Sequence, residues 1–130
     1  MRGGVVSDGR EATVSLEVMS TVSDRDSINI QVVIDTGFTG HLTLPPDTVR
    51  NLSLPERGFV DVLLADGEMT SLNVYEARVL WHGRARRVPV YEADGGPLIG
   101  MSLLRGSTLT VEVIPSGEVT IAERPRDPRR

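Results

Sequence analysis

The sequence contains no cysteine and no lysine, so all 14 of its basic residues are arginine. Without cysteine the chain has neither a disulfide framework nor a thiolate metal site, and its composition suits a reducing compartment. We draw no function from the arginine bias. The net charge is -4, whereas nucleic-acid-binding domains are typically basic. A nucleic-acid partner is therefore not expected.

Long apolar runs are also missing. The first residues lack the apolar core of a secretory signal peptide, and no later stretch approaches the ~20 apolar residues of a membrane-spanning helix. His41 and His82 are the only histidines, and neither has a partner at the spacing of a metal site. P-loop and dinucleotide-binding glycine motifs are absent. We expect a cytoplasmic protein without a metal, a cofactor or a membrane contact.

Short β-prone segments dominate what the chain does contain. Residues 12–18 alternate apolar and polar side chains with the period of a half-buried strand, and residues 28–34 return beside them as a hairpin. Helix is expected only at 45–52 and 102–105. Further β-prone segments lie at 59–64, 69–80, 86–91, 108–114 and 118–122. Many short strands separated by turn residues predict an all-β barrel or sandwich.

At 130 residues the chain is long enough for one domain but not for two. We place this domain at residues 1–123. Residues 124–130 contain only arginine, proline and aspartate, so they have nothing to bury and are expected to form a disordered tail.

The most informative stretch is Ile30–Pro45, in which an apolar run stops abruptly at Asp35. Gly37 and Gly40 permit a tight turn before apolar residues resume. A carboxylate beside a buried strand is costly unless it is neutralised, hydrogen-bonded or used chemically. Taken in isolation, Asp35 is more simply explained as a turn cap than as a catalytic group.

A second motif reverses that preference. Asp35-Thr36-Gly37 is followed by a hairpin turn at Asp66-Gly67, and then by Leu98-Ile99-Gly100 before a short leucine-rich segment. This order, over roughly residues 12–122, resembles the retropepsin-like aspartic proteases, and in particular their small stand-alone prokaryotic members. The resemblance implies a closed retropepsin-like β-barrel with one or two short helices.

The family's mechanism requires two aspartates, one from each of two equivalent turns, which activate a water for attack on a peptide carbonyl. This chain has one such turn, and its nearest second candidate, Ala93–Gly96, lacks a preceding β-branched strand. The resemblance therefore implies a homodimer acting on a peptide or protein substrate. We expect Val5–Val6 and Val119–Ile121 to close the dimer, because short β-prone ends need a sheet to join.

Roles follow by position from the same resemblance. Asp35 would be the catalytic carboxylate, and the hydroxyl of Thr36 would tie the two turns together. The backbone of Gly37 would lie close to the carboxylate and donate to it. Gly100 would pack behind Asp35, where a side chain would not fit.

The substrate-facing positions depart from the family's usual pattern. The family carries Ala or Ser directly after the DTG turn, whereas this chain has Phe38, followed by Thr39. A phenyl ring there would either narrow the cleft or desolvate the carboxylate. A flap would close over an extended peptide, with acidic groups that disfavour acidic substrates. Its tip comprises Leu64, Ala65, Asp66, Gly67 and Glu68.

Three functions remain open at this point. The first is an aspartic endopeptidase, which needs both Asp35 carboxylates to face a shared water. The second is a non-catalytic dimeric peptide-binding module on the same fold, which Phe38 favours and which would keep its affinity in Asp35→Ala. The third is a monomeric barrel with Asp35 as a turn cap, which predicts neither a dimer nor activity.

Overall fold

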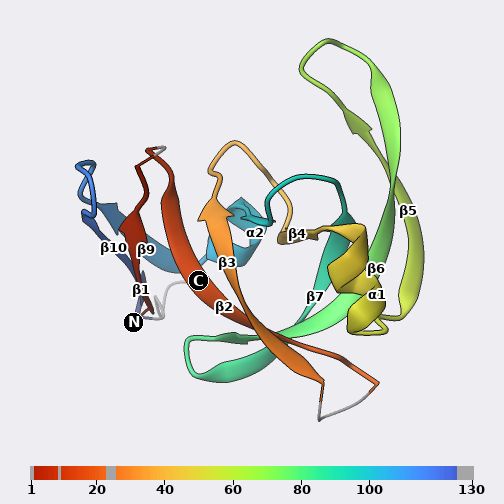
Figure 1. Ribbon diagram of the computed structural model, residues 1–130, viewed down its shortest axis with the longest axis horizontal. Coiled ribbons are helices and arrows are strands. Elements are labelled where there is room, and N and C mark those ends of the chain that lie inside the picture. Colours follow the sequence, from red (N-terminus) through yellow and green to blue (C-terminus); the bar gives the residue numbers. More distant parts are fainter. Residues whose placement is uncertain (1, 9, 23–25, 126–130) are drawn as a thin grey trace.

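The computed structural model describes residues 2–8, 10–22 and 26–125, and it consists of ten strands and two short helices (Figure 1). The strands are β1 (Arg2–Val6), β2 (Ala12–Met19), β3 (Ser27–Ile34), β4 (Leu42–Leu44), β5 (Glu56–Leu63), β6 (Met69–Trp81), β7 (Arg84–Glu92), β8 (Leu98–Ile99), β9 (Ser107–Val111) and β10 (Glu118–Glu123). The helices are α1 (Pro46–Asn51) and α2 (Met101–Leu104). The predicted mainly β architecture with one or two short helices is confirmed. Neither described helix is long and apolar enough to cross a membrane.

All ten strands belong to one sheet, in the order β5-β6-β7-β4-β8-β3-β2-β1-β10-β9. Two further pairs, Val18 with Val79 and Met19 with Arg78, join β2 to β6 and curl the sheet back on itself. Since β5 and β9 remain as its two ends, the predicted closed barrel is only partly formed.

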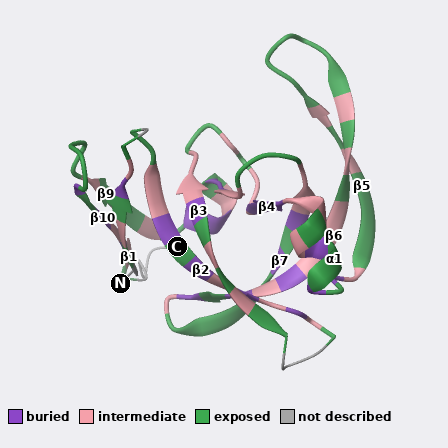
Figure 2. Cartoon of the chain, viewed as in Figure 1, coloured by how far each residue is buried: buried purple, intermediate pink, exposed green. Residues whose placement is uncertain are grey.

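The core follows from the period-2 alternation of the strands. In β2, Val14, Leu16 and Val18 are completely buried, whereas the intervening Ser15 is exposed. Buried positions from β2, β4 and β7 line the inside of the curled sheet (Figure 2). The apolar side chains removed from water here stabilise the fold by about 25 cal/mol per Å².

The longer strand β3 and the two short strands β4 and β8 position the Asp35 turn. β8 pairs parallel with β3, with Val33 opposite Leu98 and Ile34 opposite Ile99. On its other side β8 pairs antiparallel with β4. Because parallel neighbours end at the same edge of a sheet, the turn after β3 and the start of α2 emerge side by side.

The ends of the chain depart from expectation. β1 pairs with β2 on one side and β10 on the other, and β10 pairs with β1 and β9. The two strands predicted to close a dimer therefore already pair with each other, at Gly4 with Val119 and Val5 with Glu118. The strand predicted over 108–114 ends at Val111.

The first residue of the predicted disordered tail is held by the fold. The amide of Arg124 donates to the carbonyl of Gly106 at 2.9 Å. Residues 126–130 lie outside the described residues, so disorder there stays a prediction.

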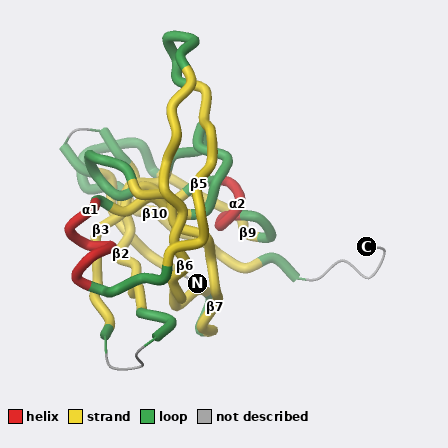
Figure 3. The backbone as a smooth tube through the Cα atoms, turned by 90° about the vertical axis from the view of Figure 1, so that its right-hand side faces the viewer, coloured by secondary structure: helices red, strands yellow, loops and turns green. Residues whose placement is uncertain are grey.

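The β5–β6 hairpin extends away from the rest of the sheet (Figures 1 and 3). Its tip is a tight turn, in which the amide of Leu64 donates to the carbonyl of Glu68 at 2.7 Å. The carboxylate of Asp66 accepts the amide of Glu68 at 2.9 Å. Gly67 sits at φ +88°, which explains the glycine. All five residues of the predicted flap tip are exposed.

Candidate active site

Asp35 follows the last residue of β3, and its backbone is fixed on both sides. Its amide donates to the carbonyl of Ile99 at 2.9 Å, and its carbonyl accepts the amide of Phe38 at 3.1 Å. The side-chain oxygen Oδ1 accepts the amide of Gly37 at 2.9 Å. A Cβ at Gly37 would lie only 3.2 Å from that oxygen. The backbone amide of Gly37 therefore orients the carboxylate of Asp35.

The start of α2 holds the loop at residues 38–41. The amides of Gly100, Met101 and Ser102 donate to carbonyls of this loop at 3.1, 2.8 and 3.1 Å. The hydroxyl of Ser102 also donates to the carbonyl of Thr39. These bonds connect the DTG turn to the Leu98-Ile99-Gly100 motif, although the two are far apart in sequence.

Gly100 leaves no room for a side chain. A Cβ there would lie 2.5 Å from the carbonyl oxygens of both Phe38 and Gly40. As predicted, the structure has no room for a side chain at residue 100. The atoms that fill this space belong to the loop after Asp35, however, rather than to its carboxylate.

The phenyl ring of Phe38 turns back against the fold. Its centroid lies 5.9 Å from that of Tyr91, in an edge-to-face arrangement at 66°. It also lies against Gly40 and Gly100, where an added Cβ would clash with ring carbons at 2.6 Å. Of the described residues, Phe38 does not line the pocket beside Asp35. The expectation that Phe38 narrows the substrate cleft stays a prediction, because that cleft would include a second chain.

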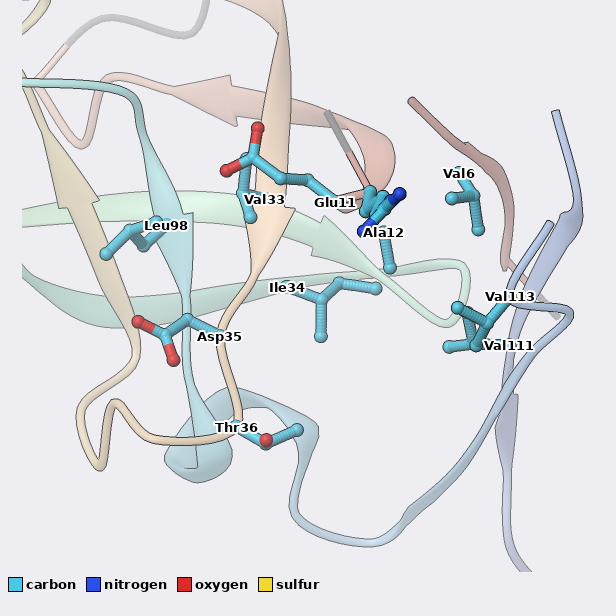
Figure 4. A pocket seen from close by; sticks show the side chains of 11 residues that line it. Val6, Glu11, Ala12, Val33, Ile34, Asp35, Thr36, Leu98, Val111 and Val113 are labelled. Atoms are coloured by element: carbon cyan, nitrogen blue, oxygen red, sulfur yellow. The ribbon is translucent and has the colours of Figure 1, made fainter. Parts of the chain in front are cut away.

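Asp35 borders a pocket of about 420 Å³. Figure 4 shows Asp35 and Thr36 on one side of it, with Val111 and Val113 on the other. Arg10 also lines this pocket, and its backbone adopts φ +66° in a turn just before β2.

The sequence analysis did not identify Arg10, Val111 and Val113 as residues that line the same pocket as Asp35. Arg10 lies in a charged turn before a strand, and the two valines lie in or just after an alternating apolar strand. Neither pattern in the sequence indicates which residue they would face.

Other predicted site residues do not line the pocket beside Asp35. Thr39 and the flap tip, Leu64–Glu68, are exposed and do not line its pocket within the described chain. Asp94, in the nearest second DTG-like segment, is exposed in the loop between β7 and β8. The pocket beside Asp35 is lined by a second carboxylate, Glu11, but among the described residues only Asp35 stands in a DTG turn.

His41 and Glu76 both have pKa values below their usual range. Burial, and then the charge of Arg86, lower the pKa of His41, whose carbonyl accepts the amide of Gly100. At the base of the β5–β6 hairpin, Glu76 lies 3.3 Å from Arg57 and 3.2 Å from Arg87. The hydrogen bond from Arg57 is the main reason that the pKa of Glu76 is lowered. Among the described residues, no cluster of three or more His, Asp or Glu could hold a metal ion.

Two solved structures share this arrangement of strands. A retropepsin-like aspartic protease from Rickettsia conorii matches with a TM-score of 0.59 and 14% identity, over 93% of this chain and 88% of that one. EIAV protease, complexed with the inhibitor HBY-793, matches with a TM-score of 0.55 and 15% identity, over 73% of this chain and 86% of that one. The chain has a retropepsin-like fold.

Identities this low establish the fold and not the activity. No protein-family model matches the sequence, and no curated protein matches it either. Within the retropepsin-like fold, the pairing of β3 with β8 brings the DTG turn and the Leu98-Ile99-Gly100 motif together.

Proposed function

We propose that this protein is an aspartic endopeptidase, in which two Asp35 carboxylates, one from each protomer of a homodimer, activate a water to hydrolyse a peptide bond. The observation that carries the proposal is the geometry of Asp35. Its carboxylate is held by the amide of Gly37 at 2.9 Å, at the rim of a pocket in a retropepsin-like fold.

The chemistry needs the two carboxylates to be in different protonation states. Two like charges at close range cannot both ionise readily, so the pair shares one proton. The ionised Asp35 takes a proton from the water, while the protonated Asp35 polarises the substrate carbonyl. Water attacks that carbonyl directly, without a covalent intermediate. Activity should therefore fall on both sides of an optimum below neutral pH.

Substrate is held by backbone and by the projecting hairpin. The β5–β6 hairpin acts as a flap, closing over an extended peptide through strand-like hydrogen bonds. Leu64 gives its exposed tip an apolar contact, whereas Asp66 and Glu68 disfavour acidic substrates. Thr36 lines the pocket beside Asp35 and ties the two DTG turns across the dimer axis. The absence of cysteine suits a cytoplasmic setting.

The alternative of a non-catalytic peptide-binding module rested on Phe38. Within one chain this ring packs against Tyr91 and does not line the pocket beside Asp35, which supports the enzymatic interpretation over the binding module.

The proposal is tested by incubating the protein with a diverse peptide library from pH 4 to 7.5 and identifying cleaved products by mass spectrometry. Wild type should cleave, and Asp35→Asn should lose at least about a hundredfold in rate, the lower range for a lost general acid–base group. The matched control is Asp94→Asn, which alters an exposed aspartate outside the pocket and should cleave normally. Equal cleavage by Asp35→Asn would overturn the proposal.

A further inference from the structure

A second pocket, of about 390 Å³, is separate from the one beside Asp35 and is lined mainly by basic side chains. The two pockets share no lining residue. Four arginines and one glutamate line the second pocket, which leaves it a net charge of +3 with histidine neutral. The whole chain carries -4, so positive charge is concentrated in one place on an acidic protein. The charged residues of this arginine pocket are Arg84, Arg86, Arg105, Arg124 and Glu123.

Hydrogen bonds join the segments that form the walls of the arginine pocket. His82 in the β6–β7 turn and Ser107 at the start of β9 are joined by a 2.8 Å hydrogen bond between Nε2 and the hydroxyl. Just after β10, the amide of Arg124 donates to the carbonyl of Gly106 at 2.9 Å. Figure 1 shows the β6–β7 turn and the tip of the β5–β6 hairpin at opposite ends of β6. The pocket is therefore built on fixed elements of the sheet and not on the projecting hairpin.

Two of the arginines stand on the face of β7 that elsewhere belongs to the core. Because side chains alternate along a strand, Arg84 and Arg86 point to the same side as the buried Val88 and Val90. Arg84 also pairs across the hairpin with Trp81, which is buried. The alternation predicts apolar residues at both arginine positions. Both arginines are nevertheless exposed, so this end of the apolar face is left open and carries charge.

Most of this positive charge has no counter-ion within the fold. Arg84 forms an ion pair with Glu123, the one carboxylate among the described residues that line the pocket. Arg86, Arg105 and Arg124 form no ion pair within the part of the chain that the structure describes. Like charges gathered in one pocket repel one another and destabilise the compact state. An anion bound between these groups would remove that repulsion.

The chemistry of the pocket favours a small anion that carries several negative charges. A guanidinium group donates through a planar fork to two oxygens of a phosphate or a carboxylate. A single carboxylate offers two oxygens and one charge, whereas a phosphate group offers three acceptor oxygens and a higher charge. Long polyanions such as nucleic acids are bound by basic domains along extended patches. This chain is acidic and its arginines line a confined pocket, so a small phosphate compound fits better.

We propose that the arginine pocket binds a diphosphate group, as free pyrophosphate or as the diphosphate of a nucleotide. One phosphate group carries about -1.5 to -2 at neutral pH, so two phosphate groups match the net charge of the pocket more closely than one. Arg86 and Arg105 come from different segments, so their forks hold the diphosphate from different sides. The inference is independent of the proposed function, because Asp35 does not line this pocket.

The test is isothermal titration calorimetry of the full chain with pyrophosphate at neutral pH and low salt, without divalent cations. Wild type should bind one pyrophosphate per chain. Arg86→Gln and Arg105→Gln should each raise the dissociation constant by about tenfold or more, because each removes charged hydrogen bonds to the anion. Titration with adenosine diphosphate identifies the source of the group. Equal affinities would assign free pyrophosphate, and tighter binding of the nucleotide would assign the nucleotide.

The matched control is Arg87→Gln, which makes the same change one residue further along β7. Arg87 lies on the opposite side of the strand from Arg86, 3.2 Å from Glu76, and does not line the pocket. Its replacement should leave the dissociation constant for pyrophosphate unchanged. Glu123→Gln acts in the other direction, because it removes the carboxylate from the pocket and frees Arg84. This variant should bind pyrophosphate several-fold more tightly, a gain that misfolding would not produce.

Two results would overturn the inference. The first is a wild type that binds neither pyrophosphate nor adenosine diphosphate at millimolar concentration. The second is an equal loss of affinity in Arg86→Gln and Arg87→Gln, which would show a general effect of charge instead of a site. Asp35→Asn should bind pyrophosphate like the wild type, so the outcome for this pocket stands apart from the outcome of the peptide-cleavage experiment.

Discussion

The amide of Asp35 donates a hydrogen bond to the carbonyl of Ile99 at 2.9 Å, which fastens the end of β3 to the end of β8. The next residue after Ile99 is Gly100, whose own amide donates into the loop after Asp35. The position of the candidate catalytic carboxylate therefore depends on a strand that lies more than sixty residues further along the chain.

Gly100→Ala should destabilise the protein by about 1–3 kcal/mol, as overpacking of a filled site does. The added Cβ would meet two carbonyl oxygens at 2.5 Å, and backbone cannot rotate away as a side chain can. Gly96→Ala is the matched control, because a Cβ there meets nothing within 4 Å. Urea unfolding of both variants checks this prediction. An equal free energy of unfolding for the two would contradict the close approach of α2 to the DTG loop.

Phe38→Ala should lower the free energy of unfolding by about 1–3 kcal/mol, somewhat less than a fully buried phenylalanine would. The ring is partly buried and packs edge-to-face on Tyr91 at 5.9 Å. For peptides that the wild type cleaves, the KM of Phe38→Ala should be close to that of the wild type, since Phe38 does not line the pocket beside Asp35. A large change in KM with unaltered stability would instead place the ring against substrate.

Glu76→Gln should remove a part of the stability that depends on pH. The pKa of Glu76 is lowered in the fold, first by the hydrogen bond from Arg57. Its contribution is therefore present above the unfolded pKa, about 4.5, and is lost as the pH falls through the lower folded value. The variant should show a shallower loss of thermal stability between pH 5 and 3 than the wild type.

Arg57→Gln and Arg87→Gln provide the controls for that experiment. Because the hydrogen bond from Arg57 is the largest cause of the lowered pKa of Glu76, replacing Arg57 should flatten the pH dependence of thermal stability more than replacing Arg87. Equal slopes in all three variants and the wild type would show that the base of the β5–β6 hairpin is not held by this carboxylate.

Local patterns in the sequence predicted the parts of the fold that local physics determines. The alternation of Val14, Leu16 and Val18 indicated β2, and Asp66-Gly67 indicated the turn of the β5–β6 hairpin. The DTG and Leu98-Ile99-Gly100 motifs, through their resemblance to the retropepsin-like family, predicted the retropepsin-like fold.

Long-range contacts were out of reach for the same reasoning. The pairing of β1 with β10, and the position of Val111 across the pocket from Asp35, depend on how segments distant in the sequence meet. The direction of Phe38 depends on a gap that Gly40 and Gly100 leave next to Tyr91. No periodicity in the sequence encodes such a gap.

The most direct test of the central claim is the cleavage rate in mixtures of wild type and Asp35→Asn at constant total concentration, well above the dimer dissociation constant. If each active site needs one Asp35 from each chain, only wild-type dimers cleave, so the rate should fall with the square of the wild-type fraction. A rate that falls in direct proportion to this fraction would show that each chain acts alone, which would contradict the shared site.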